Sequence, residues 1–249
     1  MSQAVPPGFF TLGISKERYD LPHRPIGVPV ILLVRRVICR ALSTLRENGF
    51  NLSGATEDQV TAALRAVIEN DLRQTGSVAG FNRRHYDPVV RQSQVANFDG
   101  SKLTKTPDLC FKLRHLEKEP RRAISEYDAL FVECKPVDAD HAAGSRYCDD
   151  GLNRFVIGDY AWAMQEGMMV AYARDRRTIA DHLIPAMRES DRMTALATEQ
   201  LPQVLAAHKK EGADAEAIHV SIHRRNFRWP DEKGQATNIT IYHLWHDCS

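Results

Sequence analysis

Long hydrophobic runs are missing from this 249-residue sequence. The apolar stretch at residues 28–34 is too short to cross a bilayer, and Arg35 and Arg36 follow it at once. The first residues, MSQAVPPGFF, carry neither a basic segment nor a long apolar core. We therefore expect no secretory signal peptide and no association with a membrane.

Cysteine and net charge are also scarce. The five cysteines are odd in number and scattered without a CxxC spacing, which argues against a disulfide framework and predicts a cytoplasmic protein. The formal net charge is only +1. Any nucleic-acid site must therefore be a local basic patch rather than a global field.

Several common functional motifs are lacking as well. The sequence contains no glycine-rich phosphate loop, no Walker sequence, no GxSxG elbow and no internal repeat. Among its ten histidines, His219 and His223 would share one face of a strand, but no cysteine cluster or HExxH pattern accompanies them. A zinc centre is therefore not expected.

What is present is the composition of an ordinary globular protein, 43% hydrophobic and 26% charged. Prolines and glycines concentrated in residues 1–28 indicate an irregular arm, which leaves residues 29–249 as a single domain. Hydrophobic spacing predicts helices at residues 29–48 and 56–76, and Thr56 and Gln59 would form a capping box at the start of the second.

The rest of the pattern predicts an α/β fold with a mixed central sheet flanked by helices. Residues 91–96 would form the first strand. After a polar loop at residues 137–148, Asp149 or Asp150 would cap a helix running to about Glu166, and residues 168–173 would form a buried strand in a right-handed parallel crossover. The C-terminal part would add two helices at residues 178–209 and a β-hairpin, residues 219–223 and 238–245, at the sheet edge.

The strongest chemical pattern lies between Thr106 and Pro136. Two short apolar segments rich in β-formers, residues 109–113 and 129–132, flank a highly charged connector that we expect to be a solvent-facing loop. If the two strands pair, Asp108 meets the end of the second strand. Two carboxylates and one ammonium at that edge could hold a hard divalent cation and position a water molecule.

Alternation along the second strand decides which side chains meet. Glu133 and Lys135 are two residues apart and project from the same face, while Cys134 points away. The plainer interpretation is that both charges simply end a strand in solvent. A buried strand rarely places both signs on one face without a partner or a metal, so we favour the functional interpretation.

Pro107-Asp108, a spacer and Glu133-Cys134-Lys135 resemble the PD-(D/E)XK motif of the restriction-endonuclease-like nucleases. The resemblance covers a core of about residues 56–173. It implies an endonuclease that hydrolyses DNA phosphodiester bonds with Mg²⁺, for which Mn²⁺ would substitute. Asp108 and Glu133 would be metal ligands together with the backbone carbonyl of Cys134, and Lys135 would orient the attacking water.

Nucleases of this family usually carry a further acidic residue near the metal, on the helix before the first strand. Glu57 and Glu69 are the candidates in this sequence. We favour Glu57 as a further metal ligand. Acids also favour the first turn of a helix through the macrodipole, and Glu69 would fit a solvated surface equally well.

Three arginines are candidates for nucleic-acid binding. Arg83 and Arg84 stand beside His85 and Tyr86, a mixture that can grip phosphates and stack on bases, although a solvated loop explains it equally well. Arg154 would lie near the start of a helix, where a phosphate could approach the positive end of the dipole. An ordinary surface position is the more conservative interpretation of Arg154.

Two classes of function follow. The first is a DNA endonuclease in genome defence or repair, with RNA as an alternative substrate and with a homodimer or a partner subunit supplying recognition. The second is a nuclease-like fold that binds nucleic acid or a protein without catalysis. In the second case Asp108, Glu133 and Lys135 would be kept as an ion-pair network.

Overall fold

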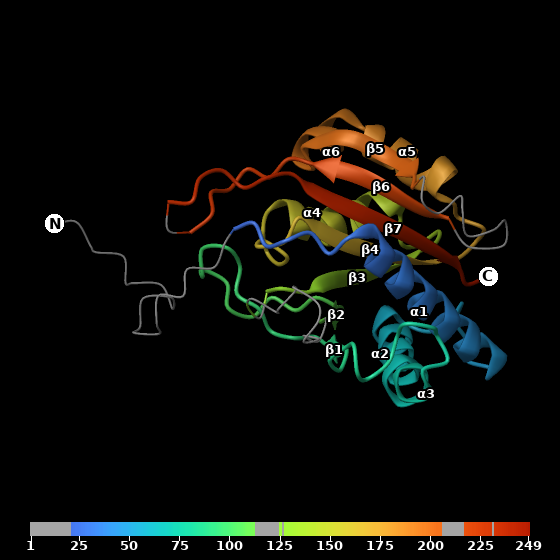
Figure 1. Ribbon diagram of the computed structural model, residues 1–249. Helices are drawn as coiled ribbons and strands as arrows, with labels where there is room; N and C mark the ends of the chain where they lie inside the picture. Colours follow the sequence, from blue (N-terminus) through green and yellow to red (C-terminus); the bar gives the residue numbers. More distant parts are fainter. Residues whose placement is uncertain (1–20, 113–124, 126, 206–216, 231) are drawn as a thin grey trace.

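The computed structural model describes residues 21–112, 125, 127–205, 217–230 and 232–249, and a seven-stranded mixed sheet runs through its centre (Figure 1). The strands lie in the order β1-β2-β3-β4-β7-β6-β5. Their bounds are β1 Val90–Arg91, β2 Leu109–Phe111, β3 Leu130–Val137, β4 Glu166–Ala173, β5 Thr198–Val204, β6 Ile218–His223 and β7 Ile239–Asp247. Residues 1–20 of the predicted arm and most of the connector after Lys112 lie outside the described residues, while residues 21–27 are irregular as predicted.

Parallel and antiparallel pairs are combined in this sheet. β4 pairs in parallel with β3 on one side and with β7 on the other, while the remaining neighbours are antiparallel. β3 and β4 are buried along their whole lengths, as expected of central strands covered on both faces. The predicted α/β class, the β2–β3 hairpin pairing and the parallel β3–β4 crossover are confirmed.

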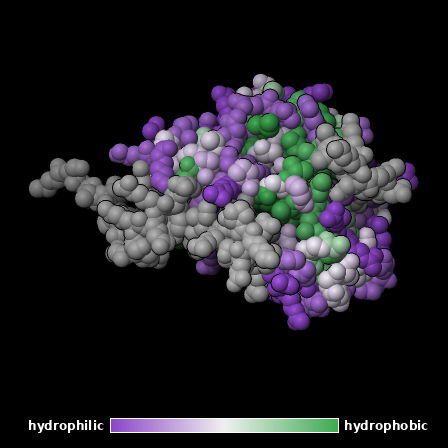
Figure 2. Space-filling view, in the orientation of Figure 1, coloured by the Kyte–Doolittle hydropathy of each residue, from purple (hydrophilic) through white to green (hydrophobic). Residues whose placement is uncertain are grey.

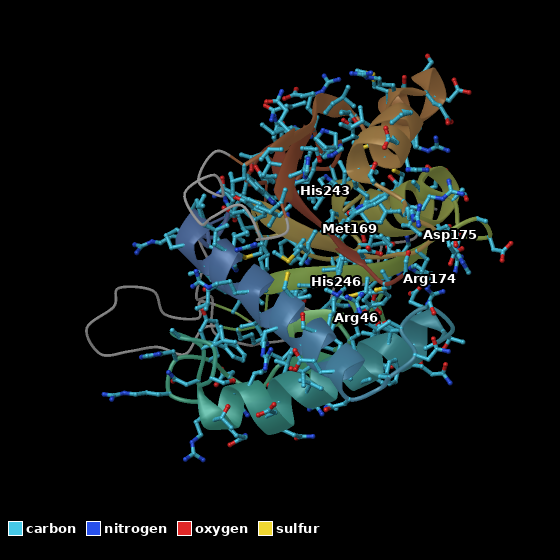
Figure 3. The ribbon with its side chains drawn as sticks, turned by 90° about the vertical axis from the view of Figure 1, so that its right-hand side faces the viewer. Arg46, Met169, Arg174, Asp175, His243 and His246 are labelled. Atoms are coloured by element: carbon cyan, nitrogen blue, oxygen red, sulfur yellow. The ribbon has the colours of Figure 1, made fainter. Side chains whose placement is uncertain are left out.

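Helices cover both faces of the sheet (Figures 1 and 3). On one side lie α1 (Val28–Glu47) and a helix made of α2 (Glu57–Val67), η2 (Ile68–Leu72) and α3 (Arg73–Thr75). On the other lie η3 (Ala143–Leu152), α4 (Asn153–Val156), η4 (Ile179–Leu183), α5 (Ile184–Arg188) and α6 (Ser190–Ala195). Within the described chain, no helix has the length and apolarity needed to span a membrane.

Local sequence accounts well for the first two helices. The capping box predicted at Thr56 and Gln59 is present in both directions, and Gly76 closes the helix in the left-handed region with φ 67°. Figure 2 shows apolar side chains gathered on the part of the surface where α1 meets β7 and β6, with hydrophilic residues around them.

The middle of the chain departs from the prediction in three places. The first strand is only β1, and Val95, beyond it, forms a single bridge with Lys105. β3 continues through Val137. The helix that follows it begins at Ala143, so Asp149 and Asp150, the predicted caps, lie inside this helix. The helix stops at Val156 because the chain turns at Gly158, where φ is 74°; Glu166 belongs to β4.

The C-terminal part differs more. The β6–β7 hairpin exists, but it is not at the sheet edge, because β7 pairs with β4. The outermost strand is β5, which occupies residues predicted to be helical. Two register shifts and Pro202 in β5 are typical of an edge strand. The last residues of the predicted helical segment, 206–209, lie outside the described residues.

A chain of buried hydrogen bonds ties β6 and β7 to η3. Tyr147 Oη lies 2.9 Å from His243 Nδ1, and Ser221 Oγ lies 2.7 Å from His243 Nε2 and 2.8 Å from His223 Nε2. The chain ends where His223 Nδ1 contacts the carbonyl oxygen of Leu196 at 2.9 Å. Because a carbonyl oxygen only accepts hydrogen bonds, His223 carries its proton on Nδ1 and its Nε2 accepts from the Ser221 hydroxyl. Ser221 Oγ then accepts from His243 Nε2, and His243 Nδ1 accepts from the Tyr147 hydroxyl.

Candidate active site at the fork between two strands

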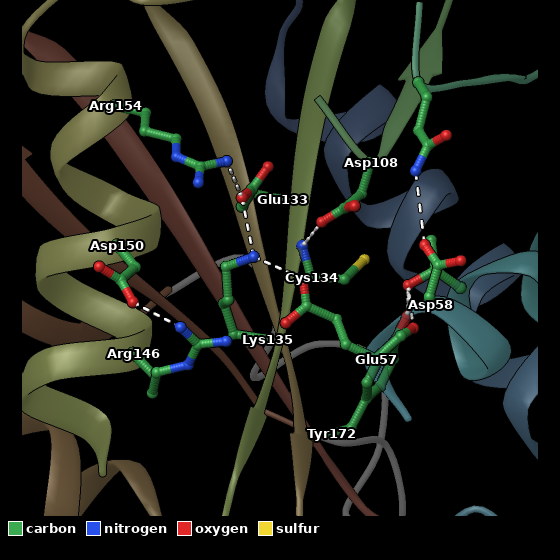
Figure 4. A network of polar contacts seen from close by, with 12 residues as sticks. Glu57, Asp58, Asp108, Glu133, Cys134, Lys135, Arg146, Asp150, Arg154 and Tyr172 are labelled. Atoms are coloured by element: carbon green, nitrogen blue, oxygen red, sulfur yellow. Dashed lines mark hydrogen bonds and ion pairs between the residues drawn. The ribbon is translucent and has the colours of Figure 1, made fainter. Parts of the chain in front are cut away.

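The candidate site lies where β2 and β3 part (Figure 4). Their pairing ends at Leu109 and Val132, and from Glu133 to Val137 β3 keeps β4 as its only neighbour among the described strands. Asp108, just before β2, turns its side chain into this fork. Its Oδ2 accepts the Cys134 backbone N–H at 2.7 Å, in place of a ladder bond.

Lys135 occupies the centre of the fork. Its Nζ lies 2.6 Å from Glu57 Oε1 and 3.0 Å from Glu133 Oε1. The Lys135 side chain is buried beside η3, where a Cβ at Gly151 would clash with the Met169 side chain at 2.7 Å and touch the lysine stem at 3.4 Å. The structure therefore brings Glu57 of α2, Asp108 before β2, and Glu133 and Lys135 of β3 together from three separate places in the sequence.

Glu57 is in place because the start of α2 is fixed on several sides. Behind it, the buried Thr61 Oγ1 lies 2.9 Å from the hydroxyl of Tyr172 on β4. Arg174, at the end of β4, donates to the carbonyls of Leu52 and Ala55 just before the helix. These contacts place the first residue of α2 beside Lys135.

Glu69 has a different role. Its carboxylate is buried, pairs with Arg73 at 2.8 Å and accepts the Val89 backbone N–H at 2.7 Å. These bonds fix the strand that follows the helix. Of the two acids considered from the sequence, only Glu57 reaches the cluster.

The Glu133 carboxylate is bonded unevenly. Oε1 receives both Lys135 and, at 2.8 Å, Arg154 Nη1, whereas Oε2 is buried and has no hydrogen-bond partner among the described residues. The Arg154 side chain is 38% exposed, so part of its guanidinium still faces solvent. Arg154, proposed from the sequence as a phosphate contact, is therefore also a neighbour of the cluster, but it lies in the last turn of the helical segment that begins at Ala143 and not near a helix start as predicted.

Burial and mutual repulsion shape the charges here. Burial and the nearby Glu133 raise the pKa of Asp108 to about 7, against the opposing pull of Lys135 and the Cys134 N–H. Burial alone would lower the pKa of Lys135, but Glu133, Asp108 and Glu57 outweigh it and raise that pKa. The cluster thus stabilises the protonated form of Lys135 and disfavours ionisation of Asp108 beside the other carboxylates.

Cys134 contributes its backbone rather than its side chain. The thiol is buried on the opposite face of β3, and burial holds its pKa well above the usual range. A neutral thiol in that position is unsuited to binding a cation. The prediction that Cys134 takes part only through main-chain atoms is compatible with this arrangement.

Arg83 and Arg84 are not gathered with these residues. Both are exposed in the loop after α3, at the opposite end of the helix from Glu57. Three residues after Arg84, the Asp87 backbone N–H donates to the Lys112 carbonyl oxygen. Lys112 follows the end of β2, whereas Asp108 precedes its start. Any contact that these arginines make with a ligand is therefore remote from the fork.

One neighbour of the cluster was missed by the sequence argument. Tyr160 is fully buried, and its hydroxyl lies beside Glu133 and Arg154, where burial and the Glu133 charge hold its pKa well above the usual range. In the sequence, Tyr160 is one of several apolar positions of a helical stripe. Nothing in that periodicity distinguishes it from a core residue.

A cavity of about 430 Å³ opens apart from the cluster, because none of the four cluster residues lines it. It lies at the carboxyl ends of β3, β4 and β7, where Asp138, Arg174 and Ser249 follow those strands. Asp138 holds the His141 ring at 2.7 Å and is 3.2 Å from Arg174. Ligands of open α/β sheets commonly bind at this edge.

The donor atoms at the fork are of the kind that a hard cation binds, but they do not converge on a single point in this structure. Three carboxylates face the fork, and one buried oxygen, Glu133 Oε2, still lacks a partner in the described structure. Yet in the described part of the chain no three acidic, histidine or cysteine side chains converge on one point. The Lys135 ammonium stands between Glu57 and Glu133 instead. Comparisons with protein-family models, curated proteins and solved structures found no match to this chain.

Proposed function

We propose that the protein is a Mg²⁺-dependent endonuclease of the PD-(D/E)XK class that hydrolyses DNA, with Mn²⁺ able to substitute. The observation that carries this proposal is the convergence of Asp108, Glu133 and Lys135 at a strand fork, with Glu57 beside them. An unpaired buried carboxylate oxygen in the same place is costly without a ligand, which supports a cation there.

Asp108, Glu133 and Glu57, with the Cys134 carbonyl, are the groups that would hold the cation. When bound, it would neutralise charge on the scissile phosphate and lower the pKa of a bound water. Asp108 must lose its proton to take part, and its pKa of about 7 places this change near neutral pH. Glu133 offers Oε2 while Arg154 keeps Oε1 in position.

Lys135 would carry the remaining chemistry. Its ammonium is held at the fork and has a raised pKa, so it stays protonated and can donate hydrogen bonds. In that state it would orient the attacking water and stabilise the negative charge that develops on the phosphate oxygens. To do so it must exchange its bond to Glu57 or Glu133 for one to substrate.

The substrate and partners are further parts of the proposal. The exposed part of the Arg154 guanidinium can contact a phosphate next to the fork. With a net charge of +1, binding would depend on such local contacts or on a second copy or partner subunit in the cytoplasm. The apolar area over α1 and β6 in Figure 2 is a surface where such a copy could pack.

One observation favours a second candidate function. Lys135 already satisfies Glu57 and Glu133, and such an ion-pair network needs no metal. In this alternative the fold binds nucleic acid or a protein without catalysis. Metal binding separates the two functions, because only a native metal site makes the melting temperature depend on metal concentration.

The decisive experiment is cleavage of supercoiled plasmid and of single-stranded DNA with Mg²⁺, Mn²⁺ or EDTA. Lys135→Met, which keeps the length of the side chain, should cut at least about 100-fold more slowly. Lys105→Met is the matched control, because Lys105 also pairs with a buried acid, Asp159, but touches none of the four cluster residues, and Lys102 still holds Asp159 in the variant. It should cut like wild type.

The outcomes separate the candidates. Metal-dependent cutting that Lys135→Met loses and Lys105→Met keeps would support the nuclease. Equal cutting by wild type and Lys135→Met would refute the assigned role of Lys135. A folded wild type that neither cuts nor shows a metal-dependent shift in melting temperature would favour the non-catalytic alternative.

A further inference from the structure

Two buried polar atoms without partners stand side by side at the fork. Glu133 Oε2 and Tyr160 Oη are each buried and lack a hydrogen bond within the described residues. The Tyr160 hydroxyl lies near enough to Glu133 and Arg154 for weak polar contacts, but neither contact has the geometry of a full hydrogen bond. Each of the two atoms carries a cost in the folded protein that so weak a contact removes only in part.

The fold holds the Tyr160 ring firmly in this position. The ring packs edge-on against Phe155 of α4, with centroids 4.9 Å apart. The turn between them is fixed by Gly158, by the Asp159 N–H bonded to the Arg154 carbonyl at 2.9 Å, and by Lys102 and Lys105 on the Asp159 carboxylate. A small rotation to pair the hydroxyl is therefore opposed by close packing.

Two other fully buried tyrosine hydroxyls in the same core are satisfied. Tyr147 is equally inaccessible, and its hydroxyl lies 2.9 Å from His243 Nδ1. Tyr172, also fully buried, lies 2.9 Å from Thr61 Oγ1. The unpaired state of Tyr160 is thus a property of the fork and not of tyrosines in this core.

We infer that Tyr160 is a positioning residue of the proposed nuclease centre, whose hydroxyl bonds the hydration shell of the cation held by Glu133. This rests on the proposed function. Magnesium keeps several of its waters when proteins bind it, and those waters need acceptors and donors around the site. Binding of the ion, rather than folding, then satisfies both Tyr160 Oη and Glu133 Oε2.

Tyr160→Phe should therefore behave differently from the loss of an ordinary buried hydroxyl. Removing a hydroxyl that has no partner should leave the metal-free protein as stable as wild type or slightly more stable. Removing a group that serves the cation should weaken Mg²⁺ binding by roughly ten-fold. A hydroxyl with a purely structural role would give the opposite pair of results.

The test compares Tyr160→Phe with Tyr147→Phe in the full chain. Both changes delete one buried hydroxyl from a fully buried ring, but only Tyr147 loses a bond. Melting temperatures are measured in EDTA and over a Mg²⁺ and a Mn²⁺ titration, with no substrate present. We expect Tyr147→Phe to melt lower in EDTA with an unchanged metal dependence, and Tyr160→Phe to melt as wild type in EDTA with a weakened metal dependence.

Other melting results would contradict either the role of Tyr160 or the metal centre itself. If wild type and Tyr147→Phe respond to metal and Tyr160→Phe responds equally, the inference is wrong while the nuclease proposal stands. If Tyr160→Phe melts lower in EDTA and binds metal normally, the hydroxyl is structural and the inference is again wrong. If wild type itself shows no response to either metal, the proposed metal centre fails, and the inference fails with it.

Discussion

Lys135 balances the charge of the fork. Its ammonium contacts Glu57 and Glu133 directly, and Asp108 acts on it from the third side. Removing the positive charge would leave buried carboxylates facing one another in a region of low dielectric. The lysine therefore contributes to folding as well as to the proposed chemistry.

The first prediction concerns this double role. In EDTA, Lys135→Met should lower the free energy of unfolding by roughly 3 kcal/mol, measured by urea denaturation at pH 7.5. Lys105→Met should cost less than about 1 kcal/mol, because Lys102 still pairs with Asp159. A Lys135→Met protein as stable as wild type would show that the carboxylates of the fork do not need the ammonium.

The second prediction concerns Asp108 and pH. The folded pKa is about 7, against 3.8 for a free aspartate, so the folded state keeps a proton that the unfolded chain releases. The contribution of Asp108 to stability is therefore full below pH 4, falls as pH rises to about 7, and is constant above. Its total size has an upper limit of roughly 4 kcal/mol, at about 1.4 kcal/mol per pKa unit.

Asp108→Asn isolates this effect, because the amide oxygen can still accept the Cys134 N–H. In EDTA, the variant should gain stability relative to wild type as pH rises from 4 to 7, and the difference should be flat above pH 7. Urea denaturation at half-unit steps measures it. A difference that does not change with pH would mean that Asp108 titrates normally.

The sequence predicted those members of the fork that a local pattern marks, either the short motif or a helix start. Asp108, Glu133 and Lys135 follow from strand alternation and the family resemblance, and Glu57 from its place at a helix start. The Glu133 contact of Arg154 and the position of Tyr160 depend on how the turn at Gly158 packs against β3. No spacing in a single sequence encodes that packing.

At the scale of elements, the start of α2 is the piece that connects folding with the site. The Thr56 hydroxyl accepts the Gln59 N–H, and the first helical residue is Glu57. The capping box therefore fixes the backbone of a residue whose side chain bonds Lys135. A loss of the cap would loosen both together.

The third prediction tests this link with two caps. Thr56→Ala should cost about 1 kcal/mol of stability and weaken the metal-induced rise in melting temperature. Thr178→Ala removes a similar cap at the start of η4, where the Thr178 side chain accepts the Asp181 N–H. It should cost a similar amount but leave the metal response unchanged. If Thr56→Ala and Thr178→Ala changed the metal response equally, Glu57 would have no particular role in binding the metal.

The elements that sequence predicted well are those whose pattern is local. α1, α2, β3 and β4 have long apolar periodicities, and caps or glycines mark the ends of the helices. β5 was missed because a solvent-facing edge strand with Pro202 lacks a clear alternation. The position of β7 was missed because pairing with β4 is a non-local contact, which hairpin signals do not report.

At the scale of the whole molecule, two buried histidines limit stability in acid. Burial lowers the pKa of His223 to about 4, and burial together with its histidine neighbours holds the pKa of His243 well below its usual range. The unfolded chain binds protons at these residues from about pH 6.5 downward, while the folded one does not. Stability is therefore lost as pH falls from 6.5 towards 4, by about 1.4 kcal/mol per pH unit for each histidine.

The fourth prediction follows from this chain of bonds. In proton NMR of the ring Cε1–H groups, His223 and His243 should not titrate between pH 8 and 5, because burial lowers both pKa values. A midpoint near 6.5 for either buried histidine would mean that the Tyr147–Ser221–Leu196 chain of hydrogen bonds opens readily. The same spectra serve as a check that the site variants keep the core intact.

The place of β7 in the sheet has a consequence for how the protein is made. Of the seven strands, it is synthesised last, yet it joins β4 to β6. Until the ribosome has passed these residues, the nascent chain holds β4 with an open edge that carries unpaired backbone groups. The final assembly is therefore a step that follows translation of nearly the whole domain, and a stalled chain would be a good substrate for chaperones and for aggregation.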